Sequence, residues 1–203
     1  MRWRVIATAF TLALGAGPAS AQPDQNSRWC AGEDGATLEQ TIGGCTAVIE
    51  AGRDTPQKLA LAHSLRGGAF YYKNELARAI ADYDHAIRLD PTFARAWTNR
   101  CWARAVVGEL RGAVADCDES LRLEPGVANK FENRAFAYLK LGEFERAIAD
   151  YDAGLKLDPS NRADFLYGRG LARLKKGDGG GHADVAAAKA LHAKIDEEFA
   201  SYG

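Results

Sequence analysis

Residues 128–161 read ANKFENRAFAYLKLGEFERAIADYDAGLKLDPSN, and this stretch decides the fold because two preceding segments repeat its pattern. Residues 60–93 and 94–127 align with it without gaps, so three copies follow one another at a spacing of 34 residues. A period of this length is typical of stacked supersecondary units. The copies share an alanine at position 20, a leucine at position 30 and a proline at position 32: Ala79, Ala113, Ala147; Leu89, Leu123, Leu157; Pro91, Pro125, Pro159.

Within each copy, apolar residues recur at intervals of three and four, which predicts two amphipathic helices. The turns between them are expected near Asn74-Glu75, Gly108-Glu109 and Gly142-Glu143. The proline at position 32 prevents one helix from continuing into the next. Because a single helical hairpin cannot bury its own apolar face, the copies are expected to stack into an all-α solenoid.

The repeats resemble the tetratricopeptide-repeat family, most closely at Ala94–Trp97 (ARAW) and Lys140–Ile148 (KLGEFERAI). The resemblance implies a right-handed α-solenoid of helical hairpins that binds another protein or a peptide in its concave groove. Residues 60–93, 94–127 and 128–161 would be repeats 1 to 3. No cofactor is expected.

The flanking segments are predicted to cap this array. Residues 162–203 contain a degenerate fourth repeat, in which glycines at 177–181 replace the usual turn and a helix from about 182 to 199 forms a charged cap. At the other end, residues 37–59 predict a capping helix and linker, and residues 22–36 are expected to be flexible.

The first 21 residues have the pattern of a cleaved signal peptide. Arg2 and Arg4 precede an apolar run, and Ala19-Ser20-Ala21 provides a small-x-small cleavage site. An uncleaved anchor is the alternative. The leader indicates export, with the periplasm of a Gram-negative bacterium as the expected compartment and no membrane insertion of the mature chain. A net charge of -1 argues against nucleic-acid binding.

Four cysteines fit an oxidising compartment. Cys101 and Cys117 occupy positions 8 and 24 of one hairpin, at similar heights on facing helices, so a disulfide is expected there. The alternative is two small side chains that fill a tight contact. Cys30 and Cys45 would then join the N-terminal segment to the first helix.

Each repeat also carries an arginine at position 7 and an aspartate at position 23. An arginine at a packing position requires a partner, so the sequence predicts structural ion pairs; a row of ligand-binding arginines is the alternative. The second aspartate of each Asp-x-Asp pair lies on another helix face, which argues against a metal site. The predicted pairs are Arg66–Asp82, Arg100–Asp116 and Arg134–Asp150.

In the resembled family, one face of each first helix lines the groove. Carried onto this chain, that face predicts a partner-binding groove of aromatic and amide side chains. The alternative is that terminal helices cover this surface. The predicted residues are Tyr71, Tyr72, Arg95, Thr98, Asn99, Trp102, Val106, Asn129, Asn133, Phe136 and Leu139.

One subgroup of the family grips C-terminal carboxylates with lysine, arginine and asparagine. Asn99 matches that clamp, but Ser64, Gly68, Asn129 and Asn133 do not, so a chaperone-tail receptor is not predicted. No catalytic constellation is present in the sequence. We therefore expect a scaffold or adaptor rather than an enzyme; a permanent subunit of an envelope or secretion complex is the alternative, and the oligomeric state stays open.

Overall fold

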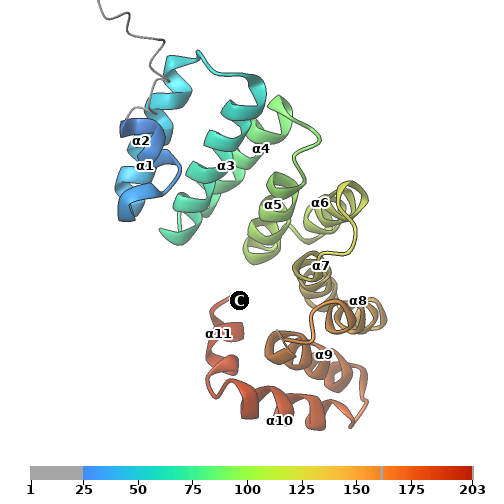
Figure 1. Cartoon of the computed structure of the whole chain (residues 1–203). Coiled ribbons are helices and arrows are strands. Elements are labelled where there is room, and N and C mark those ends of the chain that lie inside the picture. Colours follow the sequence, from blue (N-terminus) through green and yellow to red (C-terminus); the bar gives the residue numbers. More distant parts are fainter. Residues whose placement is uncertain (1–24, 161, 203) are drawn as a thin grey trace, which may run out of the picture.

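The computed structural model describes residues 25–160 and 162–202, which form α-helices, one short 3-10 helix and no strand. The predicted leader over residues 1–21 lies outside the described residues. The helices follow one another along an arc, and the C-terminus lies inside it (Figure 1). The predicted all-α solenoid is therefore confirmed. No helix in the described part is long and apolar enough to cross a membrane.

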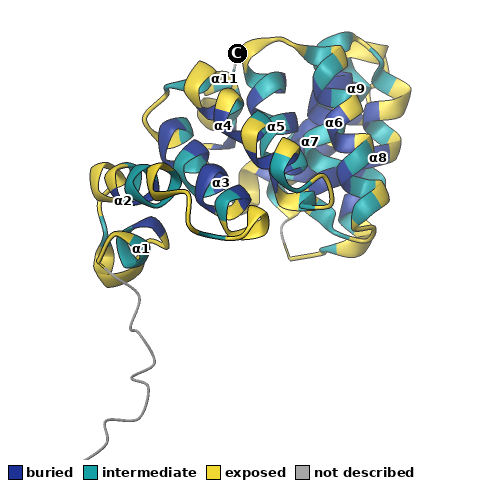
Figure 2. Cartoon of the chain, turned by 90° about the horizontal axis from the view of Figure 1, so that it is seen from above, coloured by how far each residue is buried: buried dark blue, intermediate teal, exposed yellow. Residues whose placement is uncertain are grey.

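Four helical hairpins form the body of the arc. In the first three, the small residues at position 20, Ala79, Ala113 and Ala147, are fully buried where the two helices of a hairpin meet. Figure 2 shows buried residues between neighbouring helices and exposed residues on the outer surface and at the turns. The hairpins are α3 (Pro56–Tyr72) with α4 (Leu76–Leu89), α5 (Ala94–Val107) with α6 (Leu110–Leu123), α7 (Ala128–Leu141) with α8 (Phe144–Leu157), and α9 (Arg162–Lys176) with α10 (Gly181–Leu191).

The turns of the hairpins depend on one left-handed residue each. Gly108, Gly142 and Gly177 have φ angles of 88°, 79° and 89°, and Asn74 takes the same place in the first hairpin with a φ of 60°. Glycine adopts this conformation without steric cost, and asparagine tolerates it better than most residues. The same conformation thus reverses the chain in all four hairpins, including the degenerate one.

Tyrosines at position 24 fill the space left by glycines on the first helices. A Cβ atom added to Gly67 would lie 2.8 Å from Cε1 of Tyr83, and one added to Gly168 would overlap the ring of Tyr151. These close approaches set the distance between neighbouring helices.

At the N-terminal end, α1 (Gln25–Cys30) packs beside α2 (Leu38–Ala51), and the 3-10 helix η1 (Glu33–Gly35) contacts α1. The expectation of a flexible segment over residues 22–36 is wrong for these helical parts. The reason is a disulfide between Cys30 and Cys45, which holds α1 against α2.

At the C-terminal end, the single helix expected from 182 to 199 is wrong, because the chain forms α10 and then a separate α11 (Ile195–Ser201). His192 is extended, with φ −142° and ψ 100°, and ends α10. The break lets Ile195 bury completely against Leu166 and Tyr167 of α9. Helix α11 consequently turns back into the inside of the arc (Figure 1).

Candidate functional site

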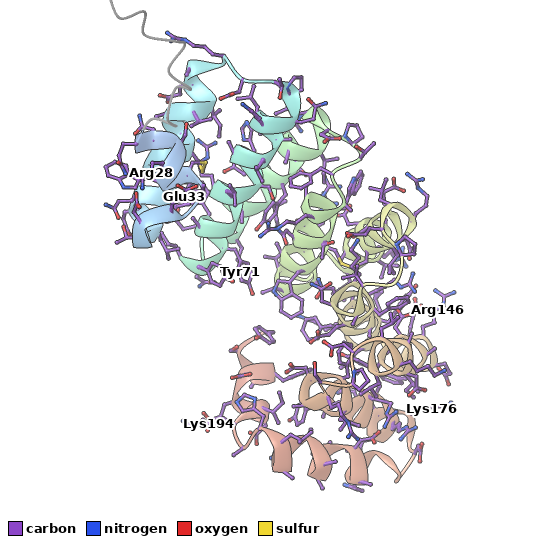
Figure 3. All side chains as sticks on the ribbon, viewed as in Figure 1. Arg28, Glu33, Tyr71, Arg146, Lys176 and Lys194 are labelled. Carbon is purple, nitrogen blue, oxygen red and sulfur yellow. A yellow bond between two sulfur atoms is a disulfide. The ribbon has the colours of Figure 1, made fainter. Side chains whose placement is uncertain are left out.

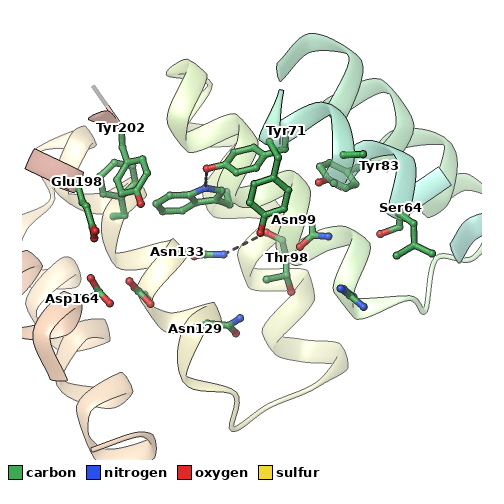
Figure 4. A pocket seen from close by; sticks show the side chains of 18 of the residues that line it. Ser64, Tyr71, Tyr83, Thr98, Asn99, Asn129, Asn133, Asp164, Glu198 and Tyr202 are labelled. Carbon is green, nitrogen blue, oxygen red and sulfur yellow. Dashed lines mark hydrogen bonds between the residues drawn. The ribbon is translucent and has the colours of Figure 1, made fainter. Parts of the chain in front are cut away.

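The inside of the arc contains a cavity of about 640 Å³, which we call the groove (Figure 4). Side chains from α3, α5, α7, α9 and α11 line it. Tyr71 lies on this inner side, whereas Arg146 and Lys176 lie on the outer side (Figure 3). The predicted residues that line the groove are Tyr71, Tyr72, Arg95, Thr98, Asn99, Trp102, Asn129, Asn133 and Phe136.

Two predicted residues do not line it. Leu139 is buried in the core with Ala135 and Tyr138, because this turn of α7 faces the following helices. Val106 lies outside the lining, and its carbonyl oxygen accepts a hydrogen bond of 3.4 Å from Lys140 Nζ. Their assignment to the groove is therefore wrong.

Three aromatic residues form one side of the groove, and α11 packs against them. Trp102 Nε1 donates a hydrogen bond of 2.6 Å to the Tyr71 hydroxyl, and the Trp102 and Phe136 ring centroids are 5.1 Å apart. The rings of Tyr202 and Phe199 contact these two from the C-terminal end, with the Trp102 and Tyr202 centroids 5.0 Å apart. The C-terminal residues therefore cover the aromatic side and leave the rest of the groove open.

Asparagine side chains line the middle of the groove. Asn133 Nδ2 donates a long hydrogen bond of 3.5 Å to the Thr98 carbonyl oxygen. Asn99 and Asn129 make no side-chain hydrogen bond to another described residue, so their amides can bond a ligand. The Thr98 side chain already has a partner within the protein, because its hydroxyl forms a 2.6 Å hydrogen bond with the Ser120 hydroxyl.

Three carboxylates lie at the end of the groove beside α11: Glu132 on α7, Asp164 on α9 and Glu198 on α11. We call this the acidic end, and Figure 4 shows Asp164 and Glu198 on the same side of the pocket. Burial and the nearby charge of Asp164 raise the pKa of Glu132 to about 7. Burial and the charge of Glu198 also raise the pKa of Asp164.

The hydroxyl of Tyr151, on α8, also borders the groove. This side chain is fully buried, and its hydroxyl has no hydrogen-bond partner within the described part of the chain. Burial raises the pKa of this phenol well above its ordinary value. The repeat pattern did not indicate Tyr151, Asp164 or the residues of α11 as groove residues, because they come from a packing position, the degenerate repeat and the cap. The spacing of Ile195, Phe199 and Tyr202, at intervals of four and three residues, indicates an apolar face at the C-terminal helix.

Away from the groove, each position-7 arginine links its own hairpin to the element that precedes it. Arg100 donates to both carboxylate oxygens of Asp116, at 2.8 and 2.6 Å, and its third nitrogen contacts Asp84 of the preceding hairpin at 2.5 Å. The same pattern recurs at Arg66 with Asp82 and Thr46, at Arg134 with Asp150 and Asp118, and at Arg169 with Asp184 and Asp152. Because Nε, Nη1 and Nη2 are all engaged, we assign these arginines to the stacking of the hairpins.

Both expected disulfides are present in the structure. Cys30 is joined to Cys45, and Cys101 is joined to Cys117 across the second hairpin. The second bond occupies the place that Gly67 and Tyr83 fill in the first hairpin. It therefore substitutes a covalent link for a packing contact.

Comparisons with known proteins agree with this architecture. The family model described as TPR repeat matches residues 67–100 and 135–177. A crystal structure of MamA protein superposes with a TM-score of 0.68 at 17% identity, covering 85% of this chain and 94% of that one. The first TPR of Spaghetti (RPAP3), bound to the HSP90 peptide SRMEEVD, superposes with a TM-score of 0.56 at 23% identity, over 59% of this chain and 95% of that one.

The second TPR domain of human RPAP3, in complex with the HSP70 peptide SGPTIEEVD, is 25% identical, with a TM-score of 0.56 over 58% of this chain and 98% of that one. No curated protein matches the sequence. The 34-residue pattern, the stacked hairpins and the family match agree. The chain therefore contains TPR repeats, which the family model matches over residues 67–100 and 135–177.

Proposed function

We propose that this protein is a protein-interaction module that binds a peptide segment of a partner in its groove. The observation that carries the proposal is the open part of the groove, where Asn99 and Asn129 present amides that no described residue bonds. Such amides can bond the backbone of an extended peptide, while the exposed ring of Tyr72, which also lines the groove, can cover its apolar side chains. The RPAP3 domains named above hold peptides on the same fold, which supports this use of the groove.

The peptides in those two structures end in EEVD, but this chain offers little for such a tail. Ser64, Gly68, Asn129 and Asn133 stand where the carboxylate clamp of the family has basic or amide side chains. None of the four carries a positive charge. Arg95 is the basic side chain among the lining residues. The proposed ligand is therefore an internal segment rather than an acidic C-terminus.

A peptide selection tests the proposal. A library of random dodecapeptides displayed on phage is panned against the chain from Gln22 onward, and enriched peptides are synthesised with blocked termini. Asn99→Ala/Asn129→Ala should weaken binding at least tenfold, whereas Gln57→Ala, an exposed amide outside the groove, should not change it. Peptides that bind all three forms equally would refute the groove as the site.

The alternative, a permanent structural subunit, predicts contacts through the outer surface. Outside the groove lining, the exposed large apolar residues Leu61, Val107, Leu157 and Leu191 come from different helices, and scattered residues of this kind are ordinary on a monomer. We therefore favour the adaptor. No catalytic step forms part of this proposal.

We also propose that the protein works in the periplasm. The leader-like residues 1–21 and the two disulfides support this location. Osmotic-shock release of the expressed full chain, with mass spectrometry of its N-terminus, tests it. Retention of residues 1–21 in a cytoplasmic fraction would contradict the proposal.

A further inference from the structure

The acidic end of the groove draws its three carboxylates from three different helices. Glu132 comes from α7, Asp164 from α9 and Glu198 from α11, and all three line the same cavity. Figure 4 shows Asp164 and Glu198 facing this space. The arrangement arises from tertiary packing, because the degenerate repeat and the last helix bring two of the carboxylates beside Glu132.

The fold supplies little positive charge to this end. Among residues 25–160 and 162–202, Glu132 and Asp164 form no ion pair, and Glu198 has one partner, His192, at 3.5 Å. The charge that affects the pKa of Glu132 is that of Asp164, which is also negative. Partly buried carboxylates that lie close together without cations destabilise the folded state, so this arrangement lowers the stability of the protein.

The hydroxyl of Tyr151 is a second and independent indication. It is fully buried, it lines the groove, and it lacks a hydrogen-bond partner among the described residues. Buried polar groups are nearly always hydrogen-bonded in folded proteins. After burial, the charges of Glu132, Asp164 and Asp150 also raise the pKa of this phenol. A ligand that donates hydrogen bonds could use its lone pairs together with the carboxylates.

We propose that the acidic end binds the cationic side chain of a lysine or arginine in the partner peptide. An ammonium or guanidinium group supplies only donors, which match carboxylate oxygens and a phenol oxygen. No group of three or more metal-ligating side chains in the described part is arranged to hold a metal ion, so the complementary cation is organic. This inference rests on the proposed function, because it names the chemistry of the peptide that the groove takes.

The test uses the peptides enriched by the selection above, with Glu132→Gln and Asp164→Asn as the site variants. Glu145→Gln is the matched control, since Glu145 is exposed on α8, lies 3.1 Å from Lys176 and is outside the groove lining. Replacing the lysine or arginine of the peptide by glutamine should weaken binding at least tenfold. Glu132→Gln should cause a similar loss, and the two changes together should cost little more than either one.

Calorimetry provides a readout that a structural effect would not produce. A bound cation lowers the pKa of Glu132, whose neighbours are Asp164 on α9, Glu198 on α11, and the Tyr151 phenol on α8. Binding at pH 7 should therefore release protons, seen as a dependence of the measured heat on the ionisation enthalpy of the buffer. The effect should disappear in Glu132→Gln.

The outcomes separate the two proposals. Peptides that need Asn99 and Asn129 but carry no required lysine or arginine would overturn the cationic anchor and leave the groove as the binding site. Peptides indifferent to the asparagine variants, or no enrichment at all, would overturn both. Peptides with an acidic anchor that bind better to Glu132→Gln would reverse the assigned charge.

Discussion

Removal of the Arg134 guanidinium should strongly destabilise the stack of hairpins. Arg134 donates to both oxygens of Asp150, at 2.7 and 2.8 Å, and to Asp118 at 2.6 Å. Asp150 is 7% exposed, so Arg134→Met would leave a buried carboxylate without its counter-charge. Breaking a buried pair in this way costs about 3–5 kcal/mol. Because the Arg134 side chain keeps 21% exposure, we expect the lower end, about 3 kcal/mol.

Two further variants isolate the cause. Arg146→Met removes a comparable arginine from the surface of the next helix, where its side chain is 67% exposed and its partner is Glu143 at 2.8 Å. That change should cost less than about 1 kcal/mol. Arg134→Met/Asp150→Asn removes both charges, so it should recover most of the stability lost in the single variant.

Urea unfolding of the oxidised chain at pH 7, followed by circular dichroism at 222 nm, measures all four forms. An Arg134→Met variant no less stable than Arg146→Met would refute the structural assignment of this arginine. A double variant as unstable as the single one would show that the stem of Arg134, rather than the orphaned charge of Asp150, carries the energy.

Three other predictions follow from particular contacts. Replacing Cys101 and Cys117 by alanine should lower the unfolding free energy by about 3 kcal/mol, since the disulfide closes a loop with a separation of 16 residues; equal urea midpoints would contradict this. Glu132→Gln should match wild type near pH 4 and exceed it by about 3 kcal/mol at pH 8, because a carboxyl with a folded-state pKa of about 7 destabilises the fold progressively as pH rises from 4.5. A difference that is constant with pH in urea titrations would refute it. Gly168→Ala, which overlaps a buried ring, should cost about 1–3 kcal/mol, whereas Gly43→Ala at an open helical position should stabilise by about 0.5–1 kcal/mol; thermal melts giving the reverse order would count against the packing.

The hairpins could be predicted from the sequence because their causes are local. A left-handed residue in each turn, a small residue at position 20 and a proline at position 32 recur every 34 residues, so one copy explains the next. The same regularity placed Trp102 and Phe136 on the inner side of the arc. The repeat position alone was not enough for Leu139, because its side chain packs with residues of α8 and α9 in the core rather than facing the groove.

The residue spacing within a repeat predicted some of the ion pairs but not all of them. The sequence indicated that Asp82 and Asp84 point to different faces, which disfavoured a shared metal. In the structure the two aspartates have different partners. Asp82 accepts a hydrogen bond from Arg66 of its own hairpin, and Asp84 accepts one from Arg100 of the next hairpin. The contact between Asp84 and Arg100 links separate repeats. It therefore depends on how the hairpins stack, and the spacing of residues within one repeat does not predict that stacking.

The acidic end could not be predicted, since it exists only after α11 folds back into the arc. Glu198 and Phe199 are adjacent on that helix, so one short element supplies a carboxylate to the open part of the groove and a ring to the aromatic side. A cation bound between Glu132 and Glu198 would therefore draw α11 toward α7, in the same direction as the contact between Phe199 and Phe136. Binding at the acidic end should strengthen the closure of the aromatic side, and a peptide that needs Trp102 uncovered would have to displace α11 and lose the anchor at Glu198.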